Sequence, residues 1–232
     1  MVARTPKPKP KPKPKPKAAR KPRRASGEHL GEDVARNMIM AAAAQVFSMQ
    51  GFRNASVEHL LTASKVSRRT FYRIFDSKED VALALYNFGT KMLIDNWKRA
   101  LAKATEPIDQ FARCIDVFLK NAAMMGRLIF VLGGEAQRLE SPLHKRRMQV
   151  HDVLLDLLRE AHPDTARMDT LLVQTTLYAL EAVTRKVLTD GDEGRKVSPD
   201  TIDRARRVML RIVSAGFAGD GDNVAPLPLG AT

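Results

Sequence analysis

Apolar side chains recur at steps of three and four residues along most of the chain after Gly31, which is the spacing of one face of an α-helix. The first such run extends from about Asp33 to Gln50. Two short runs follow, and Ser56 and Ser67 stand directly before them, where a serine hydroxyl can cap the N-terminus of a helix. The pattern therefore predicts helices over residues 33–50, 56–63 and 67–74.

Proline and glycine residues divide the rest of the chain, because proline in particular interrupts a helix. Aromatic residues make up only 6% of the composition, which favours packed helices over sheets. We expect an all-α fold of about nine helices, with an N-terminal domain of three helices followed by a C-terminal helical domain. The six further helices are predicted over residues 77–104, 107–125, 127–139, 142–161, 165–189 and 199–217.

Residues 56–75 carry the clearest functional signal, because two short capped helices joined by a turn form a helix-turn-helix. The second helix of that motif can enter the major groove of DNA. Apolar residues such as Leu60 and Phe71 can pack both helices against the first one. The surrounding segment is also basic, as a DNA-binding surface should be. It holds six basic residues (Arg53, Lys65, Arg68, Arg69, Arg73, Lys78) and two acids (Glu58, Asp76).

Residues 34–85 closely resemble the DNA-binding region of the tetracycline-repressor-like (TetR) regulators. The resemblance includes a first-helix pattern that ends in Gly51-Phe52 and a later pattern that is far more specific than a bare helix-turn-helix. That later pattern reads Val66-Ser67-x-x-Thr70-Phe71-Tyr72-x-x-Phe75-x-x-Lys78-Glu79. The resemblance implies a sequence-specific transcriptional regulator that binds a palindromic operator as a homodimer. It also implies a repressor that a small-molecule effector releases from double-stranded DNA.

The resemblance assigns DNA contacts residue by residue. Arg68 and Arg69 are expected to read base edges, because arginine bound to guanine is the commonest specific contact. Thr70, Tyr72 and Lys78 are expected to contact phosphates. Arg73 suits either role, and the capping residues Ser56 and Ser67 complete the expected DNA-binding set.

Three positions depart from the family pattern. Lys65 stands where the turn usually has glycine, so it must adopt a left-handed conformation unless the turn differs. Leu61 replaces a small alanine and must find room in the core. Ile74 replaces a histidine that often lies near phosphate, so we assign Ile74 to packing.

The predicted domain boundaries follow from composition. Residues 1–30 form a disordered basic Pro/Lys-rich tail, 31–85 the DNA-binding domain, 86–218 the ligand-binding and dimerisation domain, and 219–232 a second disordered tail. Removing the eleven positive charges of residues 1–24 from the net charge of +13 leaves about +2 for the rest. The basic tail is either a non-specific phosphate-binding arm or a solubilising extension.

The last two predicted helices carry apolar stripes that can pair two subunits in a four-helix interface. Such a two-fold dimer places two recognition helices about 34–36 Å apart on DNA. The stripes contain Met168, Leu171, Leu172, Thr175, Tyr178, Ala179, Ala182 and Val183 on one helix, and Ile202, Ala205, Met209, Ile212 and Gly216 on the other.

The effector is expected to be a largely apolar molecule in a pocket within the second domain. Each apolar candidate in the list that closes this paragraph can equally be an ordinary core residue, because methionine and phenylalanine at helical spacing are usually core residues. Gly133-Gly134 either bends a helix around the ligand or ends it. The candidate lining residues are Trp97, Phe111, Cys114, Phe118, Met125, Phe130, Gln174, Thr175 and Tyr178.

Several other classes of protein are disfavoured. The single cysteine, Cys114, rules out an intramolecular disulfide and the usual zinc sites, which fits a cytoplasmic protein. No apolar run is long enough to span a membrane. The histidines form no nucleophile-base arrangement, so no enzyme and no cofactor are expected. His144 and His151 are seven residues apart and could share a helix face, but no further ligands at metal-binding spacing accompany them, so no metal site is expected. The main alternative is a nucleoid-type structural DNA-binding protein without an inducer.

Overall fold

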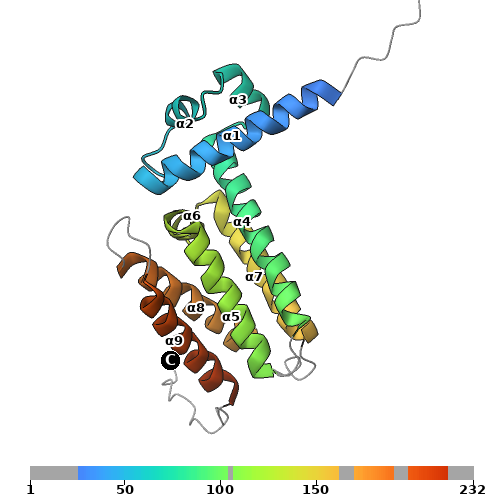
Figure 1. The fold of residues 1–232 in the computed structure, drawn as a ribbon, viewed down its shortest axis with the longest axis vertical. Coiled ribbons are helices and arrows are strands. Elements are labelled where there is room, and N and C mark those ends of the chain that lie inside the picture. Colours follow the sequence, from blue (N-terminus) through green and yellow to red (C-terminus); the bar gives the residue numbers. More distant parts are fainter. Residues whose placement is uncertain (1–25, 104–106, 162–169, 191–197, 219–232) are drawn as a thin grey trace, which may run out of the picture.

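A computed structural model describes residues 26–103, 107–161, 170–190 and 198–218 (Figure 1). Within these residues the chain forms nine α-helices and no strand, so the predicted all-α fold is confirmed. None of these helices combines the length and the apolar composition needed to cross a bilayer. The helices are α1 (Ser26–Gln50), α2 (Val57–Ser64), α3 (Arg68–Ile74), α4 (Lys78–Leu101), α5 (Pro107–Met125), α6 (Arg127–Ala136), α7 (Pro142–Ala161), α8 (Thr170–Asp190) and α9 (Pro199–Ala218).

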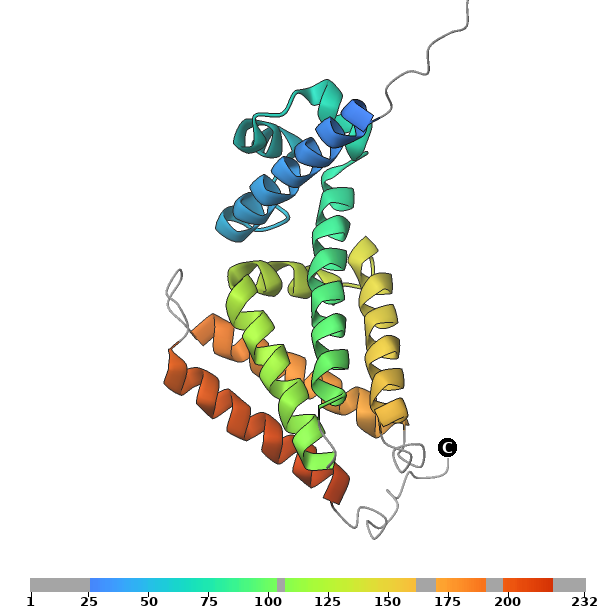
Figure 2. The same cartoon turned by 45° about the vertical axis from the view of Figure 1, so that its right-hand side comes forward.

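Helices α1 to α3 form a small unit at one end of the molecule, and α4 extends from this unit into a larger bundle (Figures 1 and 2). The small unit has its own core, in which the side chains of Ile39, Phe47, Leu60 and Phe71 are completely buried. Large apolar side chains buried at helical spacing are what hold such short helices together, because helices of seven or eight residues are not stable alone. This core fixes the orientation of α3.

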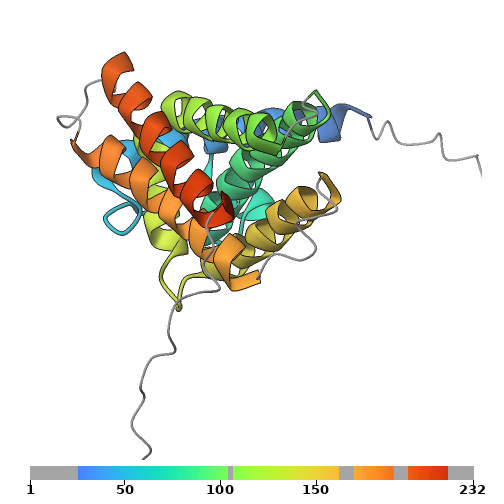
Figure 3. The ribbon, with the colours of Figure 1, turned by 90° about the horizontal axis from the view of Figure 1, so that it is seen from below.

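The larger bundle has a second core, built from α4, α5, α7, α8 and α9. Trp97 of α4, Ile115 of α5, Leu154 of α7, Leu177 of α8 and Met209 of α9 are all buried in it. Helices α8 and α9 pack against each other along one side of the bundle (Figure 3). This core also encloses the cavity described below.

Helix α6 belongs to both parts of the molecule. Its residues Leu128, Leu132 and Ala136 are buried in the core of the small unit, against residues of α1 and α4. Helix α4 is one connection between the two parts, and α6 is a second one. A change in the position of α6 would therefore reach the helix-turn-helix through α1 and through the Glu135–Arg53 pair.

Some predicted helix boundaries need correction. Helix α1 begins at Ser26 and not at Asp33, so residues 26–30, assigned to the basic tail, are helical. Helices α4 and α6 end at Leu101 and Ala136, before the predicted ends at 104 and 139. The segments 1–25 and 219–232, predicted to be disordered tails, and the predicted start of the eighth helix at 165 lie outside the described residues.

The apolar stripe on α9 was assigned to the dimer interface, and this interpretation was wrong for most of its members. Ala205 and Met209 are buried in the subunit's own core, and Ile202 packs against the same core. The reason is that α9 turns this face towards α8 and α5. Gly216 and Met168 belong to positions whose side chains are not described. The exposed apolar stripe lies on α8 instead.

Lys65 ends α2 in a left-handed conformation, with φ 56° and ψ 21°. It is the only non-glycine residue with positive φ in the described ranges. Its backbone N–H donates to the carbonyl oxygen of Leu61 at 2.9 Å, which satisfies the end of the helix. The left-handed conformation predicted for Lys65, which stands where the family usually has glycine, is therefore present. The turn keeps its usual geometry although a side chain with a Cβ occupies it.

We expect Lys65→Gly to raise the free energy of unfolding by about 1 kcal/mol, because a Cβ in the left-handed region costs about 1–2 kcal/mol and glycine avoids most of that. Urea denaturation of the full chain measures the change. Lys65→Ala is the matched control: it removes the same charge and keeps the Cβ, so it should gain little. An equal gain in both variants would show that the lysine charge, and not the backbone, limits stability.

Candidate nucleic-acid interface and buried cavity

The helix-turn-helix is built by two serine caps. The Ser56 hydroxyl accepts from the backbone N–H of His59 at 3.3 Å at the start of α2, and His59 Nδ1 accepts from the Ser56 N–H in return. The Ser67 hydroxyl accepts from the Thr70 N–H at 3.1 Å at the start of α3. Caps of this kind are worth about 1 kcal/mol each. Both serines therefore have structural roles, whatever they contact on DNA.

Helix α3 presents a polar face to solvent and an aromatic face to the core. Phe71 is completely buried, and its ring meets the rings of Tyr72 and Phe75 at centroid distances of 5.3 and 6.1 Å. Arg68, Arg69 and Tyr72 are exposed on the other side. Ile74 and Leu61 are partly buried and pack against the same core, so both departures from the family pattern are accommodated.

The positive charge of this unit is smaller than the sequence count suggested. Arg68 forms an ion pair with Glu58 of α2, Arg73 with Glu32 of α1 at 3.0 Å, and Arg53 with Glu135 of α6 at 3.4 Å. Arg69 and Lys65 have no partner in the part of the chain that the structure describes. The pairs of Arg68 and Arg73 are exposed and so contribute little stability. Arg68 and Arg73 can therefore leave their glutamate partners and contact DNA instead.

Lys78 has a different role from the one predicted. Its ammonium donates to the carbonyl oxygens of Phe52, Arg53 and Ala55 at 3.1, 3.3 and 2.7 Å. An ammonium has three protons, and here each of them has an acceptor. The nitrogen also lies 4.8 Å from the centre of the Phe52 ring. Lys78 ties the loop between α1 and α2 to α4, and the predicted phosphate contact would require its ammonium to leave one of these carbonyl oxygens.

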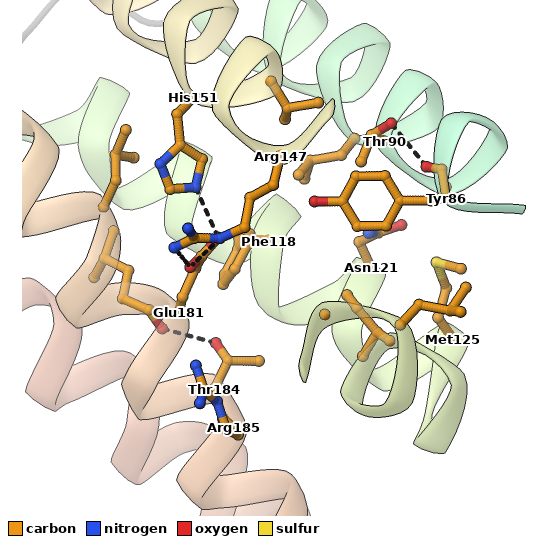
Figure 4. Close-up of a pocket in the computed structure, with 18 of the residues that line it drawn as sticks. Tyr86, Thr90, Phe118, Asn121, Met125, Arg147, His151, Glu181, Thr184 and Arg185 are labelled. Carbon is orange, nitrogen blue, oxygen red and sulfur yellow. Dashed lines mark hydrogen bonds and ion pairs between the residues drawn. The ribbon is translucent and has the colours of Figure 1, made fainter. Parts of the chain in front are cut away.

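The larger bundle encloses a cavity of about 130 Å³, drawn in Figure 4. Helices α4, α5, α6, α7 and α8 all contribute to its wall. Most of the lining is apolar, as in typical small-molecule sites. The glycines of α6, Gly133 and Gly134, lie inside this helix and line the cavity; they do not end it. The apolar lining includes Leu93, Trp97, Phe118, Met125, Ile129, Phe130, Leu132, Val150, Leu154, Leu177 and Leu180.

A charged network lies in the wall between α7 and α8 (Figure 4). Arg147 donates to Glu181 Oε2 through Nη2 at 2.5 Å and through Nε at 3.2 Å. His151, one turn further along α7, lies with Nε2 2.7 Å from Glu181 Oε1. Burial alone would raise the pKa of Glu181, but the hydrogen bonds from His151 and Arg147 hold it below its ordinary value. Glu181 is therefore anionic at neutral pH and balances the charge of Arg147.

Tyr178 covers this network from outside. Its ring centroid lies 5.1 Å from that of His151, and the Arg147 guanidinium lies 5.0 Å from it. Tyr86 enters the cavity from α4 on the opposite side (Figure 4). Burial raises the pKa of Tyr86 far above its ordinary value, so its hydroxyl stays protonated. The cavity wall thus combines one ion-paired network with a phenol group.

The structure brings only some of the predicted ligand residues together. Trp97, Phe118, Met125 and Phe130 line the main cavity. Phe111 and Cys114 line a separate small cavity of about 20 Å³, which shares the Trp97 and Phe118 walls. Gln174, Thr175 and Tyr178 line neither cavity, because this side of α8 faces outward: Thr175 and Tyr178 are exposed. Burial raises the pKa of the Cys114 thiol to about 12, so it stays neutral.

The sequence reasoning missed most polar residues of the cavity because it searched for apolar ones. Arg147 and His151 are four residues apart and share a helix face, which is a detectable signal. Glu181 is the only acid between Thr170 and Thr189, which sets it apart from the other residues of this helix. The missed polar lining residues are Tyr86, Thr90, Asn121, Gln137, Arg147, His151, Glu181, Thr184 and Arg185.

The histidine pair considered as a metal site does not converge. His144 Nδ1 lies 3.2 Å from the carbonyl oxygen of Ala136, whereas His151 bonds to Glu181. No group of three histidine, cysteine or acidic side chains gathers at metal-binding distance within the described ranges.

Comparison with known proteins connects these features to a family. Residues 39–85 match the family model described as bacterial regulatory proteins, tetR family. The chain is 26% identical over 163 residues to the HTH-type transcriptional regulator UidR of Escherichia coli K12, covering 62% of this chain and 79% of that protein. It is also 25% identical over 107 residues to the HTH-type transcriptional activator FasR of Mycolicibacterium smegmatis. That alignment covers 45% of this chain and 49% of FasR.

Solved structures share the fold over most of the chain. One is the fatty acid degradation regulator FadR from Bacillus halodurans, with a TM-score of 0.64 and 20% identity over 76% of this chain and 94% of that one. Another is the TetR family regulator PfmR from Thermus thermophilus, with a TM-score of 0.59 and 17% identity. The match covers 75% of this chain and 96% of that one. At these identities the similarity concerns the arrangement of helices.

Proposed function

We propose that this chain, which belongs to the TetR family of bacterial regulatory proteins, is a homodimeric repressor that a small-molecule ligand releases from a palindromic operator. The family is that of DNA-binding transcriptional regulators; repression, the dimer and the ligand response are our proposals. Residues 31–85 serve as the DNA-binding domain and 86–218 as the ligand-binding and dimerisation domain. The two buried cores support this division, although Leu128, Leu132, Ala136 and Leu143 of the second domain pack into the first core.

One observation carries the proposal: α3 is held from behind by Phe71 and offers Arg68, Arg69 and Tyr72 on its free face. A helix presented in this way can enter the major groove, where arginine reads guanine. Thr70 and Tyr72 lie on or beside this face and suit phosphate contacts. Arg73 can join them when it leaves Glu32.

The exposed stripe of α8 supports the homodimer. Leu171 and Tyr178 have exposed fractions of 68% and 38%, and Thr175 and Ala182 continue the same helix face. Val208 of α9, with 39% exposed, is also an outward apolar residue. A self-complementary interface on this face buries apolar area that is costly to leave in water. Two subunits joined there provide two α3 helices for two operator half-sites.

The position of α6 supports the ligand response. Ile129, Phe130 and Gly133 of α6 line the cavity, while Leu128 and Leu132 pack into the core of the DNA-binding domain. Glu135 of the same helix also pairs with Arg53, in the loop before α2. A ligand that fits only one position of α6 would therefore favour one orientation of α3. A preference of about 100-fold between the two states corresponds to about 2.7 kcal/mol of coupling.

Selection of bound sequences from a random DNA pool, with the full chain, tests the proposed function. We expect an enriched sequence with two-fold symmetry and half-sites one helical turn apart. A nucleoid-type protein would instead enrich no defined sequence. That result would overturn the proposal in favour of the structural alternative.

On the selected operator, we expect Arg69→Ala to weaken binding by about 1–3 kcal/mol and to relax the sequence preference at one or two positions. The reason is that Arg69 is exposed on α3 and has no partner within the described residues. Competition binding with cognate and random DNA measures both effects. Arg113→Ala on α5 removes the same charge from a residue outside the DNA-binding domain and should change neither. An equal loss on cognate and random DNA would contradict base reading.

A further inference from the structure

Among the described residues, three buried polar atoms of side chains that line the main cavity have no hydrogen-bond partner. They are Trp97 Nε1, Asn121 Oδ1 and His151 Nδ1, from residues that are 3%, 4% and 4% exposed. Buried polar groups are almost always paired, because leaving one unpaired away from water is costly. They come from α4, α5 and α7, so no single turn or cap explains them. Together they point to a bound molecule that supplies their partners.

The chemistry of the unpaired atoms limits what that molecule can be. His151 directs Nε2 to the Glu181 carboxylate, and in the neutral ring its Nδ1 is then an acceptor. Asn121 Oδ1 is a second acceptor, and Trp97 Nε1 is a donor. The two threonine hydroxyls of the wall are already used: Thr90 Oγ1 donates to the Tyr86 carbonyl at 2.8 Å, and Thr184 Oγ1 to the Leu180 carbonyl at 3.0 Å. A hydroxyl group suits the donor and one of the two acceptors, because its oxygen can accept from Trp97 Nε1 while its single proton goes to an acceptor such as Asn121 Oδ1.

The charged side chains that line the cavity already have partners. Glu181 already binds both Arg147 and His151, so a carboxylate placed beside them would face the Glu181 charge at close range. Arg185, which also lines the cavity, has an interaction partner of its own. The remaining lining is apolar, and a cavity of about 130 Å³ is close in size to one that holds benzene.

We propose that the cavity binds a neutral molecule of one ring, apolar over most of its surface and carrying a hydroxyl group that donates its one proton to Asn121 Oδ1 and can accept from Trp97 Nε1. Only the role of this molecule as the effector rests on the proposed function. The binding itself can be measured without DNA. The small cavity beside Trp97 has room for a short alkyl substituent on the ring.

Isothermal titration of the full chain with four probes of similar size tests the ligand class: phenol, toluene, benzoate and benzylammonium. We expect phenol to bind at least tenfold more tightly than toluene, because only phenol can bond to the unpaired atoms. Benzoate and benzylammonium should bind more weakly than phenol. Equal or tighter binding of toluene, benzoate or benzylammonium would overturn the proposal, and so would the absence of phenol binding at millimolar concentration.

Two variants of the cavity wall locate the hydroxyl contact. Asn121→Leu removes an unpaired acceptor, and we expect it to reduce the phenol-to-toluene preference about tenfold. Asn87→Leu on α4 is the matched control, because Asn87 Oδ1 is also buried and unpaired among the described residues but Asn87 does not line the cavity; the preference should not change. If Asn121→Leu does not fold, the chemical shifts of the Asn121 side-chain amide in the original chain provide the same test. A shift with toluene as large as with phenol would overturn the contact.

The outcomes for effector role and ligand class can be told apart. Phenol that binds with the expected preference but does not release the selected operator would leave the ligand class standing and contradict the ligand response. Operator release by benzoate, with no binding of phenol, would overturn the ligand class and support the ligand response.

Discussion

Phe71→Ala is expected to lower the free energy of unfolding by about 3–5 kcal/mol and to abolish specific operator binding. The Phe71 ring is completely buried behind α3, and a large-to-small change at such a position leaves a cavity in the core. Helix α3 has only seven residues, so it depends on this anchor for its stability. Urea denaturation gives the stability change, and binding to the selected operator gives the functional loss.

Tyr72→Ala separates the anchoring of α3 from its contact with DNA. Tyr72 is the neighbouring aromatic residue, but 46% of its surface is exposed on the free face of the helix. Its removal should change stability by less than about 1 kcal/mol while weakening DNA binding. Should Phe71→Ala keep a stable fold and full specificity, α3 would not be the element that presents the DNA-reading residues.

The helix-turn-helix could be predicted from the sequence because its determinants are local. Ser56 and Ser67 cap helices within three residues of themselves, and the aromatic spacing of α3 defines its buried face. The left-handed turn at Lys65 followed in the same way, from one residue and its backbone requirement. What the sequence overestimated was the positive charge, because Glu32 and Glu135 reach Arg73 and Arg53 from distant parts of the chain.

The cavity was harder to predict because its determinants are long-range. The Arg147–Glu181 contact joins residues 34 positions apart, and a helical pattern does not say which faces of α7 and α8 meet. The same limit explains the error on α9: an apolar stripe fits a dimer interface and an internal core equally well. The structure assigns Met209 to the core and leaves Leu171 of α8 exposed. Only three-dimensional packing distinguishes these cases.

Replacing one partner of a buried ion pair has a second large expected effect. Glu181→Gln should lower the free energy of unfolding by about 3–5 kcal/mol at neutral pH, because it leaves the Arg147 charge uncompensated. The Arg147 side chain is only 10% exposed, so water cannot replace the lost carboxylate. The double variant Arg147→Met/Glu181→Leu removes both charges and should be much closer to the original chain. Asp95→Asn in the exposed Lys91–Asp95 pair is the surface control and should have little effect.

The acid dependence of stability gives an independent check on the same pair. The folded-state pKa of Glu181 lies below its ordinary value, because His151 and Arg147 outweigh the effect of burial. The stability that this ionisation contributes is therefore present above the unfolded-state pKa of about 4.3 and is lost as the pH falls through the folded-state pKa. In Glu181→Gln this part of the acid sensitivity should be absent. A double variant as unstable as the single one, or an unchanged acid profile in Glu181→Gln, would show that the pair is too well solvated to matter.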